Sequence, residues 1–278
     1  MSFALPISRN AACRLLLTAI AGVMLAACVG NKSVGSSAPA ARTESEIVTD
    51  SDETPGRKRA RLRLELAMGY FEQGKTTVAL DEIKQALSAD PNFSDAYNLR
   101  GLIYMRLDDP GLAEDSFRRA ISLNPRDANA MHNYGWLLCQ QKRYADAVQQ
   151  FGRALEAPGY GDRAKTLMTQ GVCQMQAGQK AEAERSLTQA YELDAANPIT
   201  GYNLALLLSQ RQEWTRAQFY IRRVNNTQAA NAETLWLGVK VERQLNNRDA
   251  VTSLGGQLQR RFPQSKEALA YERGNFND

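Results

Sequence analysis

Bulky apolar side chains recur along most of the chain at a nearly constant interval. They lie at Ile83, Phe117, Phe151, Leu187, Ile221 and Leu254. Alanines accompany them at Ala79, Ala113, Ala147, Ala183, Ala217 and Ala250, with separations of 34, 34, 36, 34 and 33 residues. A period of this length is typical of stacked helical units, each of which buries its apolar face only against its neighbours. The pattern therefore predicts six helical repeats.

A second column, made of small residues, keeps the same spacing. Its members are Ala67, Gly101, Gly135, Gly171, Ala205 and Gly238. Small residues are needed where two helices approach closely, and large ones fill the space beside them. Helix-breaking residues fall between the two columns, at Gly74, 108–111, Gly178 and 246–247. Each repeat is thus predicted to be a pair of helices joined by a tight turn.

The second unit resembles a known repeat most closely. Residues at the spacing of the tetratricopeptide repeat are Tyr97, Gly101, Tyr104, Ala113, Phe117, Ala120 and Pro125. The resemblance implies an all-α superhelical solenoid of six tetratricopeptide repeats over residues 58–262. Residues 263–278 are expected to form a capping helix and tail, because the exposed end of a stack needs a cover. Two extra residues around 159–161 predict a bend or a subdomain division between the third and fourth units.

Residues 1–27 are predicted to be a lipoprotein signal peptide. Arg9 and Arg14 precede an apolar run of about thirteen residues, shorter than the ~20 residues that span a bilayer. The run ends in Leu-Ala-Ala-Cys at 25–28, which resembles the lipobox of bacterial lipoproteins. The resemblance implies lipidation of Cys28 and an outer-membrane address, because Val29 rather than aspartate follows it. The alternative is an ordinary signal peptide that contains a cysteine.

Residues 28–57 are predicted to be a flexible tether. They are rich in Gly, Ser, Ala, Thr and acidic residues and show no apolar periodicity. Five basic residues between positions 57 and 63 follow the acidic ones. These either contact anionic lipid or a partner, or belong to a solvated first helix whose charges partly neutralise the tether. We favour the second interpretation.

Cys139 and Cys173 are the cysteines that lie beyond the signal peptide and Cys28. An oxidising periplasm permits a disulfide between them. Both fall within predicted helices, however, where buried free thiols are common. The sequence therefore favours two free thiols.

The first helix of each repeat lines the concave face of such a solenoid, so its second, fifth, ninth and twelfth places give a list of groove residues. Ten are expected to contact a partner: Leu64, Met68, Phe71, Leu102, Met105, Trp136, Met168, Val172, Tyr202 and Leu206. In the sixth unit these places hold Ala232, Leu235, Val239 and Glu242. An apolar, methionine-rich trough suits an amphipathic helix or an extended apolar segment. The alternative for each residue is packing within the core.

Charge and the scarcity of catalytic groups narrow the function. The chain has 34 basic and 30 acidic residues, and loss of Arg9 and Arg14 with the signal peptide leaves 32 against 30. A net charge so close to zero does not indicate a basic surface that would bind nucleic acid. The sequence has no phosphate-binding glycine loop, nucleophile elbow or metal-ligand spacing. A base formed by His132, the one histidine, with Asp127 or Glu156 has little support. We expect a binding protein without catalytic residues, metal or cofactor.

A lipid anchor, a tether and six repeats together resemble the PilF/PilW family of type IV pilus pilotins. The resemblance implies that the chain, anchored on the periplasmic face of the outer membrane, brings the secretin subunit PilQ there and promotes its multimerisation. Other pilus assembly proteins are further expected partners. The alternative is a periplasm-facing lipoprotein scaffold for cell-wall enzymes or for outer-membrane protein assembly.

Overall fold

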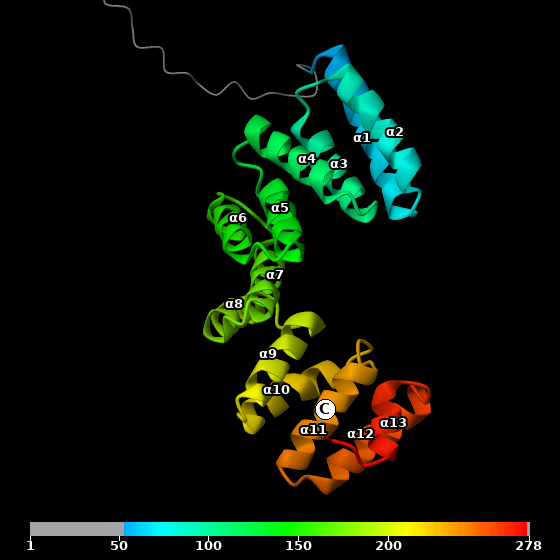
Figure 1. Cartoon of the computed structure of the whole chain (residues 1–278), viewed down its shortest axis with the longest axis vertical. Coiled ribbons are helices and arrows are strands. Elements are labelled where there is room, and N and C mark those ends of the chain that lie inside the picture. Colours follow the sequence, from blue (N-terminus) through cyan, green and yellow to red (C-terminus); the bar gives the residue numbers. More distant parts are fainter. Residues whose placement is uncertain (1–52, 277–278) are drawn as a thin grey trace, which may run out of the picture. The chain divides into compact units, whose positions relative to one another are not determined.

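The computed structural model describes residues 53–276, and within them every regular element is a helix. The helices follow one another as six pairs and one further helix (Figure 1). The pairs are α1 (Pro55–Glu72) with α2 (Thr76–Ala89), α3 (Ser94–Arg106) with α4 (Pro110–Leu123), α5 (Ala128–Gln140) with α6 (Tyr144–Glu156), α7 (Arg163–Gln176) with α8 (Lys180–Leu193), α9 (Pro198–Gln210) with α10 (Trp214–Asn225), and α11 (Ala232–Gln244) with α12 (Arg248–Arg261); α13 (Lys266–Glu272) follows.

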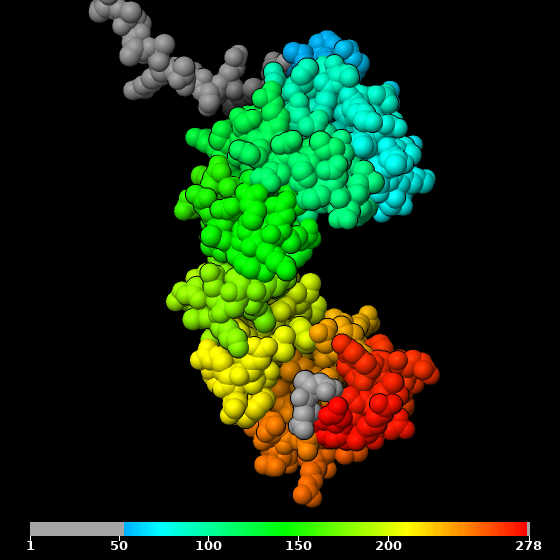
Figure 2. Space-filling model, viewed as in Figure 1, coloured from blue at the N-terminus to red at the C-terminus, as the bar shows by residue number. Residues whose placement is uncertain are grey.

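Neighbouring pairs pack on each other along the chain. Each second helix contacts the first helix of the next pair, and the first helices of successive pairs also contact each other. Helix α13 contacts α11 and α12, so it takes the place that the first helix of a seventh repeat would have. The side chains form a continuous stack (Figure 2). The expected all-α solenoid of six tetratricopeptide repeats with a capping helix is confirmed.

The two columns of the sequence pattern meet inside each pair. Gly101 lies so close to Phe117 that an added Cβ would be 2.5 Å from the ring. Gly135 approaches Phe151 in the same way, at a corresponding distance of 2.8 Å. Both rings are fully buried. A side chain on either glycine would force the facing phenylalanine ring out of a close-packed core. The small residues of one column therefore leave the space that the bulky residues of the other column fill.

The turn within each pair contains one residue with a positive φ. These residues are Gly74, Asp108, Lys142, Gly178, Gln212 and Asn246. Glycine adopts this conformation at little cost, and Asp and Asn tolerate it. Lys142 and Gln212 both have a φ of 61° although their side chains disfavour it. The sequence therefore predicts four of the six turns, those marked by Gly, Asp or Asn, and gives no signal for the other two.

Two local signals start α1 at Pro55. Thr54 accepts a hydrogen bond from the N–H of Arg57 at 3.1 Å, and proline fits the first helical position. Residues 55–57, expected to belong to the tether, are therefore helical. The predicted signal peptide, Cys28 and the tether up to residue 52 lie outside the described residues. No helix within residues 53–276 is both long and apolar enough to cross a membrane.

Three of the five basic residues at the start of the solenoid are paired with acids. Three ion pairs form: Arg57–Asp90 at 2.5 Å, Arg61–Glu53 at 3.3 Å and Arg63–Glu82 at 2.8 Å. The three arginines are still a third or more exposed, so each pair contributes only about 0–1 kcal/mol. This geometry favours the interpretation of a solvated first helix, and one of the acids, Glu53, comes from the predicted tether.

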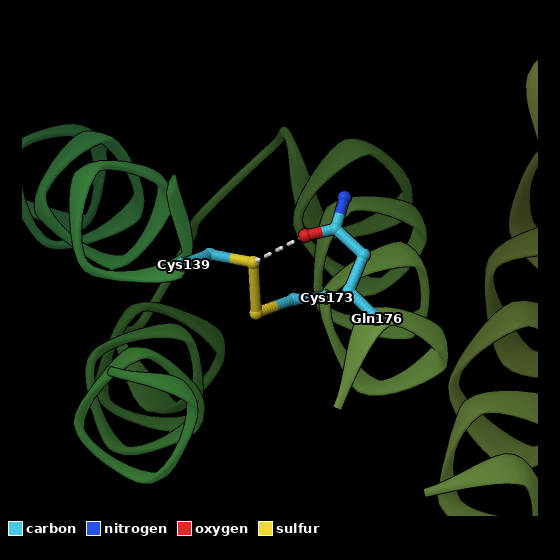
Figure 3. Close-up of a disulfide and its surroundings, with 3 residues drawn as sticks. All are labelled: Cys139, Cys173 and Gln176. Atoms are coloured by element: carbon cyan, nitrogen blue, oxygen red, sulfur yellow. Dashed lines mark hydrogen bonds between the residues drawn. A yellow bond between two sulfur atoms is a disulfide. The ribbon is translucent and has the colours of Figure 1, made fainter. Parts of the chain in front are cut away.

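Cys139 and Cys173 form a disulfide between α5 and α7, so the prediction of free thiols is wrong (Figure 3). The two cysteines are 34 residues apart on the first helices of adjacent repeats, and their Cα atoms are 5.9 Å apart. That distance lies in the range a disulfide spans. The sequence does not indicate that the two cysteines are close, because their distance depends on how the third repeat stacks on the fourth. The described residues form one compact unit, so the subdomain division, one of the two outcomes predicted at 159–161, is wrong. The local bend, the other outcome, stays a prediction.

Candidate partner-binding groove

A hollow of about 390 Å³ lies across the first helices of the third, fourth and fifth repeats. We call it the central groove. Its apolar lining consists of Trp136 on α5, Met168 and Val172 on α7, and Ile199 on α9. Polar residues complete the lining: His132, Asn133, Lys165 and Thr169. The structure thus brings together three of the ten predicted contact residues, Trp136, Met168 and Val172.

Helix geometry leaves the central groove apolar and uncovered. Met168 and Val172 are four residues apart and therefore share one face of α7. Ile199 lies in the first turn of α9, where its N–H donates to Asn197 Oδ1 at 3.0 Å. Ile199 is 52% exposed, and Trp136, Met168 and Val172 are half-buried. Clustered apolar exposure of this kind is typical of interaction sites.

The disulfide fixes two walls of the central groove. Cys139 lies three residues after Trp136 on α5, and Cys173 directly follows Val172 on α7. The covalent bond therefore holds α5 and α7 at one spacing. Gln176 lies beside the bridge, with its Oε1 3.7 Å from Cys139 Sγ (Figure 3). A groove with fixed walls loses less conformational freedom when a partner binds.

His132 is a buried member of the groove lining, with 6% of its surface exposed. Its Nδ1 lies 2.8 Å from Thr166 Oγ1, and the Tyr160 hydroxyl lies 2.7 Å from the same oxygen. Burial lowers the pKa of His132 to about 4, and the charge of Lys165 acts in the same direction. The imidazole is therefore neutral near pH 7. Asp127, one of the two carboxylates considered as its partner, instead caps the first turn of α5.

Stability is expected to fall below pH 6.5 because of His132. Its pKa is about 4 in the folded chain and ~6.5 in an unfolded one, so the unfolded state takes up the proton first. The contribution is complete above pH ~6.5 and is lost towards pH ~4, about 3 kcal/mol in total. Urea unfolding of the wild type and a His132→Gln variant, from about pH 7 to about pH 4.5, measures the difference. Equal pH dependence in both proteins would contradict this assignment.

The predicted contacts of the first two repeats lie away from the central groove. Leu64 is 8% exposed and belongs to a core cluster of α1, α2 and α3, so a partner has no access to its side chain. Phe71 is covered by Arg106, whose guanidinium carbon lies 3.8 Å from the ring centroid. Met68 is 48% exposed. The remaining two, Leu102 and Met105, are half-buried on α3 and pack against core clusters.

The predicted contacts of the fifth repeat, Tyr202 and Leu206, line a separate hollow between α9, α11 and α13.

In the sixth repeat, the second, fifth, ninth and twelfth places of the first helix do not all face a groove. Leu235 and Val239 are fully buried in a cluster that includes α13, because the capping helix covers them. Glu242 is also buried and accepts hydrogen bonds from side chains of α10.

Five residues of the central groove are absent from the ten predicted contacts: His132, Asn133, Lys165, Thr169 and Ile199. Ile199 and Lys165 occupy the second place of their repeats and His132 the fifth, so the pattern contains their signal. Asn133 and Thr169 each follow a fifth place by one residue. Successive residues of an α-helix are about 100° apart around its axis, so the residue next to a fifth place can still reach the edge of the groove. A list restricted to fixed places omits such residues.

Models of the tetratricopeptide repeat match residues 64–122, 99–162 and 164–197. The type IV pilus assembly protein PilF of Pseudomonas aeruginosa is 30% identical to this chain over 231 residues, which cover 81% of the chain and 92% of PilF. The chain belongs to the PilF/PilW family. Helices α9 to α12 of this family member continue the same pairing beyond the last repeat that the models match, and α13 follows them.

Solved structures of the PilF/PilW family have the same fold. The structure of P. aeruginosa PilF matches with a TM-score of 0.73 and 27% identity, over 80% of this chain and all of that one. The structure of PilW, a type IV pilus biogenesis factor, matches with a TM-score of 0.69 and 30% identity, over 76% and 97% of the two chains. The likeness therefore extends over nearly the whole described part of this family member.

Proposed function

We propose that this PilF/PilW family member is a lipid-anchored pilotin of type IV pilus biogenesis whose partner is a PilQ-like secretin subunit. Its relatives support the pilus role, because PilF is named a type IV pilus assembly protein and PilW a type IV pilus biogenesis factor. The observation that carries the proposal is the central groove. There Trp136, Met168, Val172 and Ile199 present an apolar surface on three helices, and a disulfide joins two of these, α5 and α7.

The central groove shields an apolar segment of the secretin during transit. Each Å² of apolar surface removed from water contributes ~25 cal/mol. Met168 adapts its side chain to an irregular partner, because methionine is unbranched and flexible. A segment held by apolar contacts alone leaves the groove without any chemical step once a neighbouring secretin subunit covers it instead. The role is therefore one of binding and release.

The anchor supplies the transport. Acylation at Cys28 fixes the chain to the outer membrane, and a tether of about 27 residues has a reach of ~25–30 Å. The repeats then stand clear of the lipid headgroups on the periplasmic face. The disulfide supports this address, because such bonds persist in oxidising compartments.

Affinity capture with the intact lipoprotein as bait, from solubilised membranes of its own organism, tests the proposal. The secretin subunit is expected to co-purify. Replacing Cys28 with Ser is expected to remove the lipid and with it the secretin multimers of the outer membrane. Cys13→Ser is the matched control: it changes a cysteine inside the predicted signal peptide and leaves the multimers intact. Recovery of cell-wall enzymes or outer-membrane assembly factors instead of a secretin would favour the scaffold alternative.

A further inference from the structure

The C-terminal tail folds back onto α11. Helix α13 ends at Glu272, and Gly274 follows with a φ of 66°, which turns the chain. The N–H of Asn275 then donates to the carbonyl oxygen of Ala270 at 2.9 Å and fixes the turn. These contacts place Phe276 against α11, where its ring stacks on Trp236 with centroids 5.4 Å apart and an angle of 22° between the planes.

Three groups surround the Phe276 ring. Trp236 provides a flat stacking surface. The guanidinium carbon of Arg243 lies 4.0 Å from the ring centroid, a cation–π geometry. Tyr271 meets the ring edge-on, with centroids 6.2 Å apart. Stacking, edge and cationic contacts of this kind all require an aromatic ring. The site is therefore matched to an aromatic side chain.

Two hollows adjoin the stacked rings of Trp236 and Phe276. One hollow of about 410 Å³ extends to Tyr202 on α9 and to α13. A second, of about 320 Å³, includes Phe276 and Trp214 in its lining. Leu206 and Leu237 line both hollows. The two hollows together thus offer more surface than one ring covers, and their lining combines apolar residues with charged ones such as Glu233 and Lys266. A peptide segment of several residues can use both kinds of contact.

We propose that this C-terminal site, formed by α9, α11 and α13, binds an extended peptide segment of a partner through an aromatic side chain, and that Phe276 fills it until such a segment displaces it. Phe276 is only partly buried, and it lines an open hollow. A ring that served only to complete the core would be enclosed. The chain's own tail shows which chemistry the site accepts.

The C-terminal site is separate from the central groove and goes beyond the proposed function. The central groove has Trp136 on α5 as its aromatic wall, whereas the C-terminal site has Trp236 on α11. A tail joined to α13 has a high effective concentration at the site, so it competes well against a partner despite few contacts. A partner segment must therefore make more contacts in the two hollows than the tail does.

A peptide supplied in trans tests the proposal on the full mature chain. The probe is the hexapeptide of residues 273–278, Arg-Gly-Asn-Phe-Asn-Asp, added to a Phe276→Ala variant whose site is free. NMR of the three tryptophan indole N–H groups is the readout, with Trp136 as an internal reference. We expect a saturable shift of the Trp236 signal and no shift of the Trp136 signal. The wild type should need at least about tenfold more peptide, because its own tail occupies the site.

Two controls complete the test. A hexapeptide with alanine in place of phenylalanine should leave the Trp236 signal unchanged. Adding Arg243→Ala to the Phe276→Ala variant should weaken binding about two- to fivefold, the loss of a cation–π contact; Arg243 is exposed, so the fold should persist. Equal peptide affinity of the wild type and Phe276→Ala would overturn the proposal. So would an unmoved Trp236 signal in a Phe276→Ala variant whose circular dichroism is that of the wild type.

Discussion

A Met168→Glu variant is expected to bind the secretin subunit at least about 100-fold more weakly than the wild type. Met168 lies in the central groove with Trp136 and Val172, so a partner that covers these side chains also covers position 168. A carboxylate there would lose its water without gaining a partner. Burying an unpaired charge costs several kcal/mol, and a factor of 100 corresponds to about 2.7 kcal/mol. Affinity capture of the secretin and the amount of its outer-membrane multimer measure the effect.

Two further variants separate a loss of binding from a loss of folding. Ile199→Glu changes a groove residue that is 52% exposed, so it should also abolish capture while leaving the helices intact. Leu193→Glu is the matched control, because Leu193 is 57% exposed at the end of α8 and does not line the central groove. Wild-type multimer levels in both Met168→Glu and Ile199→Glu would refute the central groove as the secretin site.

Removing the disulfide by a Cys139→Ala/Cys173→Ala double substitution is expected to lower the free energy of unfolding by about 3–4 kcal/mol. The bridge closes a loop of 34 residues, and the chain-entropy model gives about this value for a loop of that length. The effect should concentrate at the junction of the third and fourth repeats, because repeats contact only their neighbours. Urea unfolding followed by circular dichroism measures it, and unfolding of the variant is expected to become broader.

Reductant provides the control for the disulfide. The wild type in excess dithiothreitol should unfold like the double variant, and dithiothreitol should leave the variant unchanged. The same treatment should weaken secretin capture, because the bridge sets the spacing of the helices that carry Trp136 and Val172. Identical unfolding curves of the oxidised wild type and the double variant would contradict a stabilising role of the bridge.

The repeat pattern predicts the fold well because it records contacts between residues close in sequence. Gly101 and Phe117 belong to one helix pair, and their close approach needs a small and a large residue at a fixed separation. The pattern is weaker where backbone geometry replaces side-chain chemistry. Lys142 and Gln212 adopt a positive φ that their residue types do not suggest, so two turns carry no signal.

The candidate site is predictable only in its middle part. Trp136, Met168 and Val172 are in the central groove because a complete repeat lies on each side of them. At the ends of the stack the same outward places have different surroundings. Leu64 turns into the core of the first repeats, and Leu235 is covered by α13, which replaces a full seventh repeat. Position within a repeat therefore predicts exposure only where the neighbours are regular.

By itself the sequence determined the number of helix pairs, their order and the identity of the residues that pack inside each pair, because these depend on a period of about 34 residues and on side-chain size. Only the tertiary structure decided what depends on the stacking of one repeat on the next. It paired Cys139 with Cys173, enclosed Leu235 under α13 and seated Phe276 on Trp236. Those contacts join residues whose separation in space is fixed by packing rather than by local pattern.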